Sequence, residues 1–421
     1  MDVNKLNASI ITIGDELLIG QTIDTNSGWI SKELNKIGVW VRRQIAVGDV
    51  WDDIWQVLDE EIKASSIVII TGGLGPTADD ITKPLLCKYF GGSLVTNDQT
   101  VLHLKYLFEE VYRRPITERN LKQAQVPDIC ETLFNARGTA PGMWFEKNGK
   151  IIISLPGVPQ EMQKIMTDCV LPRLPQYFKT PFIIHQTLMV GGIGESYLAD
   201  HIAHWEEKLP AHIKLAYLPN YGMIRMRLTT QGGNKNQLEK EVEKYFAELK
   251  VLVKEWLIID EDLTIEETLA KLLKERKQTV GTAESCTGGF IAHLITKNAG
   301  ASSNFKGTIV SYDNEVKVDV LGVKKETLET VGAVSEETVI QMVKGALQTL
   351  KSDYAIATSG IMGPDGGGEN KPVGMVWIAV ANKDKIVTKK FNFRFERLRN
   401  IQQTAYTALN MLRKFIVDER S

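Results

Sequence analysis

The stretch QTVGTAESCTGGFIAHLI, residues 278–295, changes its character near the middle. The first half has the short β-rich pattern of a strand that ends at Ser285, and CTGGFIAHLI has the apolar spacing of a helix. The paired glycines between them allow a tight turn. We therefore predict a strand that passes through a sharp corner into a helix, with Ser285 and Cys286 side by side at that corner.

The same alternation of strand and helix extends outward from this corner. It continues through residues 264–421 in runs such as FKGTIVSYDN, SEETVIQMVKGALQTL and DYAIATSG, and it recurs in residues 1–175 in ASIITIG, NSGWISKELNKIG and SIVIITGG. Alternating strands and helices form a mostly parallel sheet with helices on both faces. The sequence therefore predicts an α/β protein with two α/β/α sandwich domains.

A smaller α+β unit is expected between them, in residues 181–253. Its predicted helices are ESYLADHIAHW and NQLEKEVEKYFAELKVLV, and residues 254–263 are expected to be a linker. Thr264 and Glu267 then match a capping box at the start of a helix. The lysines of the second helix alternate with glutamates, which is typical of a solvated face, and GGIGES follows a strand where an RNA-binding GXXG loop would join two helices. Nucleic-acid binding is not expected.

Composition narrows the class of protein. The chain of 421 residues has a net charge of -2, so it lacks the broad positive field of non-specific nucleic-acid binders. No export signal is visible, and no apolar run approaches the ~20 residues of a membrane helix. Four cysteines without CxxC spacing argue against a zinc site and a disulfide framework. We expect a soluble, cytoplasmic protein that has no membrane partner.

The serine corner has two interpretations. Helix amides that point back toward Ser285 would provide an oxyanion hole for acyl transfer, or Ser285 or Thr287 simply caps the helix. No histidine has an evident place as the base. The neighbouring strand ends near Tyr312, and Lys317 follows in the next helix, so parallel strands would bring both residues to the edge that carries Ser285. A desolvated lysine can act as a base, whereas a solvated one is a surface residue.

Two glycine-rich loops could bind anions. SGIMGPDGGGENKPVG follows a third strand of the C-terminal domain, although loops of this composition also occur without a ligand. In the N-terminal domain, IITGGLGPTADDITK follows an apolar strand and lacks the GK[ST] of a P-loop. Asp79 and Asp80 could bind a divalent cation or cap the next helix. GDELLIGQTIDTN adds further polar groups near the end of the first strand, among them Asn26.

The C-terminal motifs TAESCTGG, IVSYDNEVK, GAVSEETV and SGIMGPDGGGENKPVG resemble the CinA (competence/damage-inducible protein A) family. This resemblance implies hydrolysis of the carboxamide of nicotinamide mononucleotide without a cofactor. It implies Ser285 as nucleophile, Lys317 as its base and Tyr312 as an assisting group. The family arginine falls on Arg397, but its usual Gly-Asp-Arg context reads Phe-Glu-Arg here, so Arg394 or Arg399 could replace it. The implied substrate-binding residues are Thr287, Gly288, Ser359, Gly360 and Gly363.

The N-terminal motifs IGDELLIG, DTN, GGLGPTADD, ARGTAPGMW and LPGVPQEM also resemble this family, and with it the molybdopterin-binding fold. The resemblance implies a KH-type middle domain, a homodimer and a metal-dependent ADP-ribose pyrophosphatase that uses a divalent ion (Mg or Co) and possibly K. It places the substrate near Gly73, Gly75, Thr77 and Asn26, and the metal near Asp80, Asp79 and Glu161. The alternative is a non-catalytic molybdopterin- or nucleotide-binding protein linked to competence or DNA damage.

Overall fold

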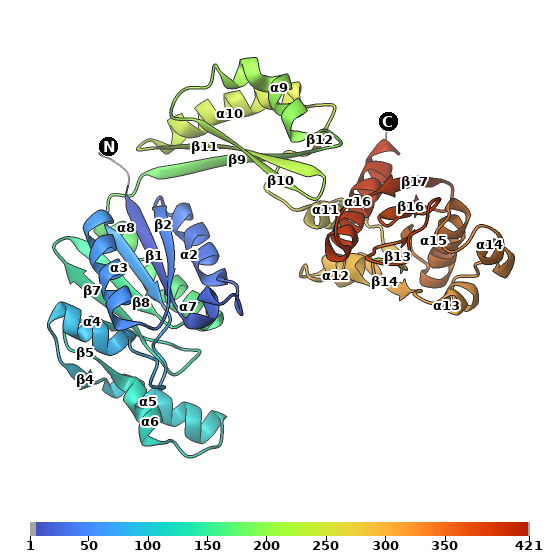
Figure 1. The fold of residues 1–421 in the computed structure, drawn as a ribbon. Helices are drawn as coiled ribbons and strands as arrows, with labels where there is room; N and C mark the ends of the chain where they lie inside the picture. The colour runs from blue at the N-terminus through green and yellow to red at the C-terminus, as the bar shows by residue number, and fades with distance from the viewer. Residues whose placement is uncertain (1–5, 420–421) are drawn as a thin grey trace. The chain divides into compact units, whose positions relative to one another are not determined.

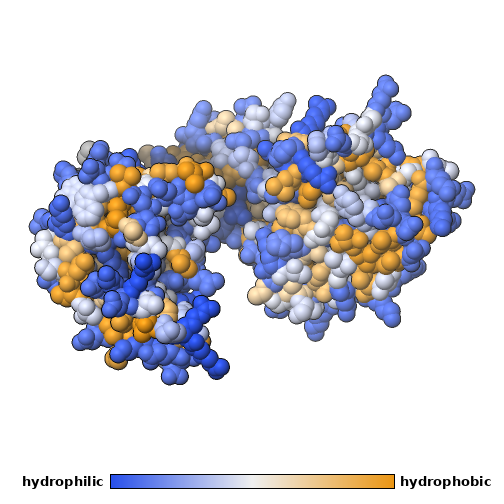
Figure 2. All heavy atoms as spheres, turned by 60° about the horizontal axis from the view of Figure 1, so that its bottom comes forward, coloured by the Kyte–Doolittle hydropathy of each residue, from blue (hydrophilic) through white to orange (hydrophobic). Residues whose placement is uncertain are grey.

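The computed structural model describes residues 6–419, which form two compact units. The first contains the chain up to residue 184 together with residues 230–241, and the second contains residues 185–229 and the chain from residue 242. Hydrophilic and hydrophobic residues are interspersed on the face of each unit drawn in Figure 2. Within the described residues, no helix is both long and apolar enough to cross a bilayer.

A six-stranded sheet forms the centre of the N-terminal domain (Figure 1). Its strands lie in the order β2 (Trp40–Val47), β1 (Asn7–Ile13), β3 (Ile67–Thr71), β8 (Lys150–Leu155), β7 (Gly142–Lys147) and β6 (Glu131–Leu133). The first four strands are parallel, and β7 pairs in antiparallel fashion with both β8 and β6.

Helices cover both faces of this sheet because successive strand residues point to opposite sides. Ile10 packs with α2 (Thr25–Lys36) and α7 (Pro159–Ile165), whereas its neighbour Ile11 packs with α3 (Trp51–Ala64) and α4 (Thr82–Phe90). The predicted α/β/α sandwich is confirmed. The remaining elements are α1 (Asp15–Leu18), β4 (Leu94–Thr96), α5 (Asp98–Lys105), the π-helical turn Tyr106–Val111, α6 (Glu118–Leu121), the 3-10 turn Lys122–Ala124, β5 (Gln125–Pro127), the π-helical turn Met166–Val170 and α8 (Leu174–Tyr177).

The middle of the chain forms a four-stranded sheet in the order β10 (Lys214–Asn220), β11 (Met223–Gly232), β9 (Phe182–Gly191) and β12 (Leu257–Ile259). Apolar residues of α9 (Glu195–Glu206) and α10 (Lys235–Leu252) join the core on this sheet. Strand β12 lies in the segment that was expected to be a linker. It is antiparallel to β9, with Leu257 opposite Val190, so part of this segment belongs to the sheet.

The C-terminal domain contains a five-stranded sheet in the order β14 (Phe305–Val310), β13 (Val280–Glu284), β15 (Tyr354–Gly360), β16 (Met375–Ala381) and β17 (Ile386–Asn392). The first three strands are parallel. One face packs against α11 (Ile265–Arg276), α12 (Phe290–Thr296) and α16 (Arg397–Asp418), and the other packs against α15 (Glu336–Leu350). The other elements are the 3-10 turn Ala301–Ser303, α13 (Asn314–Asp319) and α14 (Lys325–Thr330). The second predicted sandwich is thus also confirmed.

The predicted capping box is present at the start of α11. The Thr264 side chain accepts the amide of Glu267, and the Glu267 carboxylate accepts the amide of Thr264 at 2.7 Å.

The three parallel strands of this sheet end side by side. Glu284, the last residue of β13, pairs with Val310 of β14 on one side and with Thr358 of β15 on the other. The carboxyl ends of β13, β14 and β15 therefore meet at one edge of the sheet, where ligands bind in open α/β folds.

Candidate functional site

Ser285 follows β13 directly at this edge. Its amide donates to the carbonyl oxygen of Thr358 at 3.0 Å, so the main chain continues the sheet pairing for one residue. The side chain is half-buried. The chain then turns through Gly288 and Gly289, both with positive φ (59° and 96°), before α12 begins. Glycine adopts these angles without strain, so the corner forms as the sequence predicts.

The carboxylate of Glu284 lies beneath this corner. It is fully buried and accepts the amides of Gly289 at 3.1 Å, Ile291 at 3.0 Å and Ala292 at 2.9 Å. These are the free amides at the start of α12, which we expected to point back toward Ser285. That expectation is wrong for these three amides, because Glu284 takes them. Within residues 6–419, the amides of Cys286 and Thr287, which come next after Ser285, donate to no carbonyl or carboxylate oxygen.

The neighbours of Ser285 in the turn point into the protein. Cys286 is buried, and burial raises the pKa of its thiol to about 12. A thiol is nucleophilic as the thiolate, so this environment disfavours Cys286 as the nucleophile near neutral pH. Thr287 is buried too, and its hydroxyl lies 2.9 Å from the hydroxyl of Thr358. The Thr287 side chain therefore holds the turn against β15, and Gly288 is the exposed residue of the turn.

Lys317 is buried on α13, with only 1% of its surface exposed. Its Nζ donates to the carbonyl oxygens of Ser311 at 2.7 Å, Tyr312 at 3.2 Å and Asp313 at 3.4 Å. The amide of Ser311 in turn donates to the Glu284 carbonyl at 2.9 Å, so the amine lies beyond the end of β14, beside the end of β13. Burial lowers the pKa of Lys317, although the nearby Asp313 partly opposes this shift. This is the desolvated lysine that a base requires.

Arg397 links two loops at the same edge. Its Nη1 donates to the carbonyl oxygen of Gly363 at 2.8 Å, and its Nη2 donates to the hydroxyl of Tyr312 at 3.0 Å. Tyr312 is exposed, and Gly363 belongs to the glycine-rich loop after β15. The guanidinium therefore joins the loop that follows β14 to the loop that follows β15.

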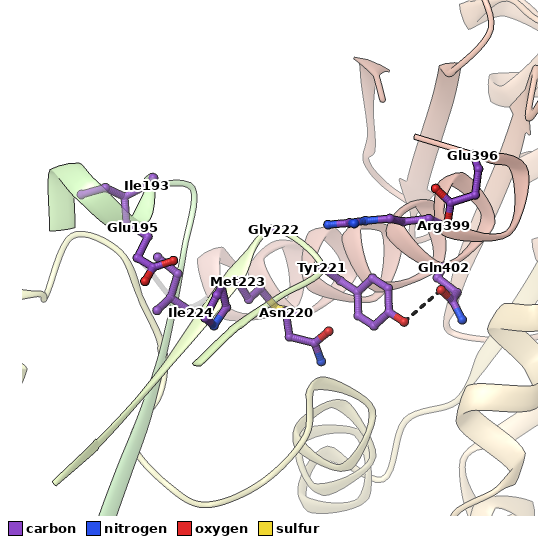
Figure 3. A pocket seen from close by; sticks show the side chains of 12 residues that line it. Ile193, Glu195, Asn220, Tyr221, Gly222, Met223, Ile224, Glu396, Arg399 and Gln402 are labelled. Atoms are coloured by element: carbon purple, nitrogen blue, oxygen red, sulfur yellow. Dashed lines mark hydrogen bonds between the residues drawn. The ribbon is translucent and has the colours of Figure 1, made fainter. Parts of the chain in front are cut away.

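Arg399 belongs to a different hollow, of about 480 Å³ (Figure 3). Its guanidinium lies 4.3 Å from the centre of the Phe395 ring, and its side chain lines the hollow together with Tyr221 and Gln402. The Tyr221 hydroxyl donates to Oε1 of Gln402 at 2.9 Å. Arg394 is exposed. Of the three candidate arginines, Arg397 is the one that bonds to Gly363 and Tyr312 of the predicted site.

The remaining predicted residues of this site shape the loop after β15. Ser359 is buried, and its hydroxyl donates to the Ala333 carbonyl at 2.6 Å. A side chain at Gly360 would come within 2.8 Å of the Met375 carbonyl oxygen, so only glycine fits there. Lys371 donates to the Val331 carbonyl at 2.6 Å. The glycine-rich loop is thus held against the turn at residues 331–333.

The predicted phosphate loop of the N-terminal domain folds around one of its own carboxylates. Asp80 accepts the amides of Gly75 at 2.7 Å and Thr77 at 2.8 Å. A side chain at Gly73 would collide with the Thr82 hydroxyl at 2.2 Å, so the start of the loop is tightly packed. Neither Asp79 nor Asp80 caps α4, which begins without a side-chain cap. The amides predicted to bind phosphate are therefore bonded to Asp80.

Asn26 contacts the start of this loop, because its Nδ2 donates to the Thr71 hydroxyl at 3.2 Å, whereas Glu161 bonds to Asn135. Asn26 donates to the Gly157 carbonyl at 2.7 Å, and its Oδ1 is buried without a partner. Glu161 accepts from Asn135 at 2.6 Å, and burial raises the pKa of its carboxyl. Within residues 6–419, no three or more His, Cys, Asp or Glu side chains lie close enough to hold a metal ion. The predicted metal ligands Asp79, Asp80 and Glu161 are therefore not part of a cluster of three such side chains.

Sequence reasoning missed two buried charged residues, Glu284 and Lys83. Lys83 donates to the Gln123 carbonyl at 2.7 Å, and burial lowers its pKa to about 8. The signal in the sequence that could have identified these two residues is their position next to a predicted strand or loop. Glu284 ends a strand expected to be buried, and Lys83 is the last residue of the phosphate-loop motif. Charged residues are seldom fully buried unless they have partners.

Three protein-family models match consecutive parts of the chain. The model described as "Probable molybdopterin binding domain" matches residues 9–176, "Damage-inducible protein CinA KH domain" matches residues 185–258, and "CinA C-terminal domain" matches residues 262–416. The last match contains Ser285, Lys317 and Arg397.

Full-length relatives show the same organisation. A CinA-like protein of Cytophaga hutchinsonii is 47% identical over 407 residues, which cover 97% of each chain. One of Flavobacterium psychrophilum is 45% identical over 417 residues, which cover 99% of this chain and 100% of the relative. Among solved structures, a competence/damage-inducible protein of Agrobacterium tumefaciens is 39% identical, with a TM-score of 0.34. That match covers 36% of this chain and 96% of the other.

Proposed function

Because the chain belongs to the CinA family, we propose that its C-terminal domain hydrolyses the carboxamide of nicotinamide mononucleotide to nicotinate mononucleotide and ammonia. The observation that carries this proposal is the buried amine of Lys317 at the sheet edge where Ser285 follows β13. A serine with a desolvated lysine is a pair that can perform acyl transfer without histidine.

In the proposed reaction, the Ser285 hydroxyl attacks the carboxamide carbon while the unprotonated Lys317 amine accepts the hydroxyl proton. The negative oxygen of the tetrahedral intermediate accepts from the amides of Cys286 and Thr287, which have no carbonyl or carboxylate acceptor among the described residues. Lys317 returns the proton to the leaving nitrogen, and ammonia departs from a nicotinoyl ester of Ser285. Water then attacks the ester, with Lys317 again accepting a proton, and releases the acid and free Ser285.

Arg397 and Tyr312 have a binding role in this proposal. Arg397 donates to both Gly363 and Tyr312, so it fixes the two loops between which a nucleotide would enter. Its positive charge also suits a phosphorylated substrate. Tyr312 is exposed, so its ring is available to the pyridine. No metal or cofactor is needed for this chemistry.

The test compares two adjacent residues. Ser285→Ala should abolish ammonia release from nicotinamide mononucleotide, whereas Cys286→Ala should retain most of it. The reverse result would assign the nucleophile to the thiol. The same assay tests the alternative of a binding protein without catalytic activity, because the wild-type form of such a protein would release no ammonia.

For the N-terminal domain, the second proposed activity is hydrolysis of the pyrophosphate of ADP-ribose to AMP and ribose 5-phosphate, dependent on a divalent metal ion. Its support is the glycine-rich loop at the carboxyl end of β3, where the Gly75 and Thr77 amides point at an anionic group, here Asp80. The described carboxylates do not form a metal cluster, so no step is assigned to a metal.

The test follows AMP release from ADP-ribose with and without a chelator, in the wild type and in Asp80→Ala. Loss of this activity in Asp80→Ala, with ammonia release retained, would support two independent sites. Unchanged activity after chelation would remove the metal from the proposal, and loss of both activities in the variant would indicate damage to the whole protein.

A further inference from the structure

Glu284 is connected to both ends of the turn that carries Ser285. Through its main chain it belongs to β13, where its carbonyl accepts the Ser311 amide at 2.9 Å. Through its side chain it binds the amides of Gly289, Ile291 and Ala292. One residue therefore ties the last position of the strand to the first turn of α12, and Ser285 lies between these two attachments.

The Glu284 carboxylate is itself held in place from the sheet. The hydroxyl of Thr282 donates to its Oε1 at 3.2 Å, and that of Thr308 lies at 3.4 Å. With the three amides, these contacts occupy both oxygens of a fully buried side chain. A carboxylate with this many donors has one orientation, so the turn that depends on it has little freedom.

A helix can be capped in simpler ways, most often by the side chain of Ser, Thr, Asp or Asn at the N-cap position. At α12 the N-cap residue is Gly289, which has no side chain to contribute, and the residue immediately before the serine caps the helix instead. The hydroxyl of Ser285 is thereby spared from capping. Since Glu284 takes the helix amides, the proposed contacts to the reacting oxygen are assigned to the amides of Cys286 and Thr287.

We propose that Glu284 is a positioning residue, which orients the Ser285 hydroxyl and the turn amides by clamping the start of α12 to the end of β13. This inference rests on the proposed function of Ser285 as a nucleophile. If it is correct, loss of the clamp should slow the chemical step far more than it weakens substrate binding, because Glu284 is buried beneath the turn and does not face the ligand.

The experiment compares Glu284→Gln with Asp353→Asn in the full chain. Asp353 is an exposed control whose carboxylate also accepts an amide and a hydroxyl, both from Thr279 at 2.7 Å, at the amino end of β15 in the same sheet. Two rates are measured for each protein: ammonia release from nicotinamide mononucleotide, and covalent labelling of Ser285 by a fluorophosphonate, followed by mass spectrometry. Labelling reports on the serine and its oxyanion donors whatever the natural substrate is.

Glu284→Gln should lower kcat and the labelling rate by about 10- to 100-fold with KM almost unchanged, because small misplacements of reacting groups have effects of this size. Asp353→Asn should leave both rates within about twofold even where it lowers the thermal midpoint as much. Equal rate effects of the two variants, or a labelling rate of Glu284→Gln equal to that of the wild type, would overturn the inference.

A second variant covers the case in which Glu284→Gln does not fold. Thr282→Val removes one hydroxyl that holds the carboxylate and keeps the side-chain shape. It should reduce labelling by about two- to fivefold, a partial effect expected from loss of one hydrogen bond, and wild-type labelling would overturn the inference. Wild-type protein that is labelled at Ser285 but releases no ammonia would refute the proposed substrate. The labelling rates of the variants would then test the role of Glu284 by themselves. Absence of labelling in the wild type would refute both.

Discussion

Replacing Lys317 with methionine removes the amine and keeps a side chain of similar length in the same buried position. If Lys317 is the base, this change should lower kcat for nicotinamide mononucleotide by about 10²- to 10⁴-fold, the usual contribution of a positioned acid–base group. Lys317→Arg should be similarly inactive, since a guanidinium stays protonated and cannot accept the Ser285 proton. Lys325→Met serves as the control, because Lys325 is an exposed lysine on α14.

The effect on folding should be much smaller. The bond from Lys317 to Ser311, at 2.7 Å, is short, whereas those to Tyr312 and Asp313 are long at 3.2 and 3.4 Å. Loss of one hydrogen bond from a charged donor costs about 1.5–3 kcal/mol, and methionine recovers part of that by removing a buried charge. The free energy of unfolding should therefore fall by about 1–2 kcal/mol, which a domain stable by about 5–15 kcal/mol tolerates.

The pH dependence separates a base from a structural lysine. Burial lowers the pKa of Lys317 below its ordinary value of 10.5, and only the unprotonated amine can accept a proton. In the wild type, kcat/KM should therefore rise with pH along a limb centred below 10.5, and this limb should be missing in Lys317→Met. Initial rates of ammonia release from pH 6 to 10, with circular dichroism at each pH to verify folding, measure both. A folded Lys317→Met with more than about a tenth of wild-type kcat would refute the role of Lys317 as the base, because a loss of less than about tenfold is smaller than the contribution of a general base.

Two further predictions concern other charged residues. Arg397→Ala should raise KM for nicotinamide mononucleotide by about tenfold, because it loses about 1–2 kcal/mol of partly exposed hydrogen bonding to Gly363 and Tyr312. Arg399→Ala should bind the substrate as the wild type does. Equal KM values for the two variants would contradict this prediction. For Lys83, the folded pKa of about 8 lies below the ordinary 10.5, so between these pH values the unfolded state binds the extra proton and stability rises with pH by up to ~3 kcal/mol. Hydrogen exchange of β3 should show this rise in the wild type and not in Lys83→Met, and a rise in both would assign it to other groups.

The architecture was predictable because alternation of strands and helices leaves few arrangements. Long buried runs such as that of β3 and the capping box of α11 are local signals, and the structure agrees with them. Strand β12 lacks such a signal. It has three residues, and its pairing with β9 joins segments about 70 residues apart in the chain, which no local pattern reports.

The sequence predicts only those features of the site that follow from the course of the main chain. Parallel neighbours end at one edge, so Ser285, Lys317 and the loop after β15 were expected there together. The choice among arginines depends on where α16 begins. Since it begins at Arg397, Arg399 projects from a different side of the helix, because residues two apart do not share a face. At that start the Asn400 side chain bonds both to the amide of Phe395 at 3.2 Å and to its carbonyl at 2.8 Å.

The two glycine-rich corners differ in what their carboxylates leave free. At the C-terminal corner, Glu284 takes the amides of the helix, and the turn amides next to Ser285 donate to no carbonyl or carboxylate oxygen of the described residues. In the N-terminal loop, Asp80 takes the Gly75 and Thr77 amides, which are the groups predicted to bind phosphate. A phosphate at that loop must therefore compete with a carboxylate of like charge for the same two donors, so the loop has to rearrange before it binds an anion. The C-terminal corner requires no such exchange, because its carboxylate is directed at the helix and away from the place where negative charge would develop.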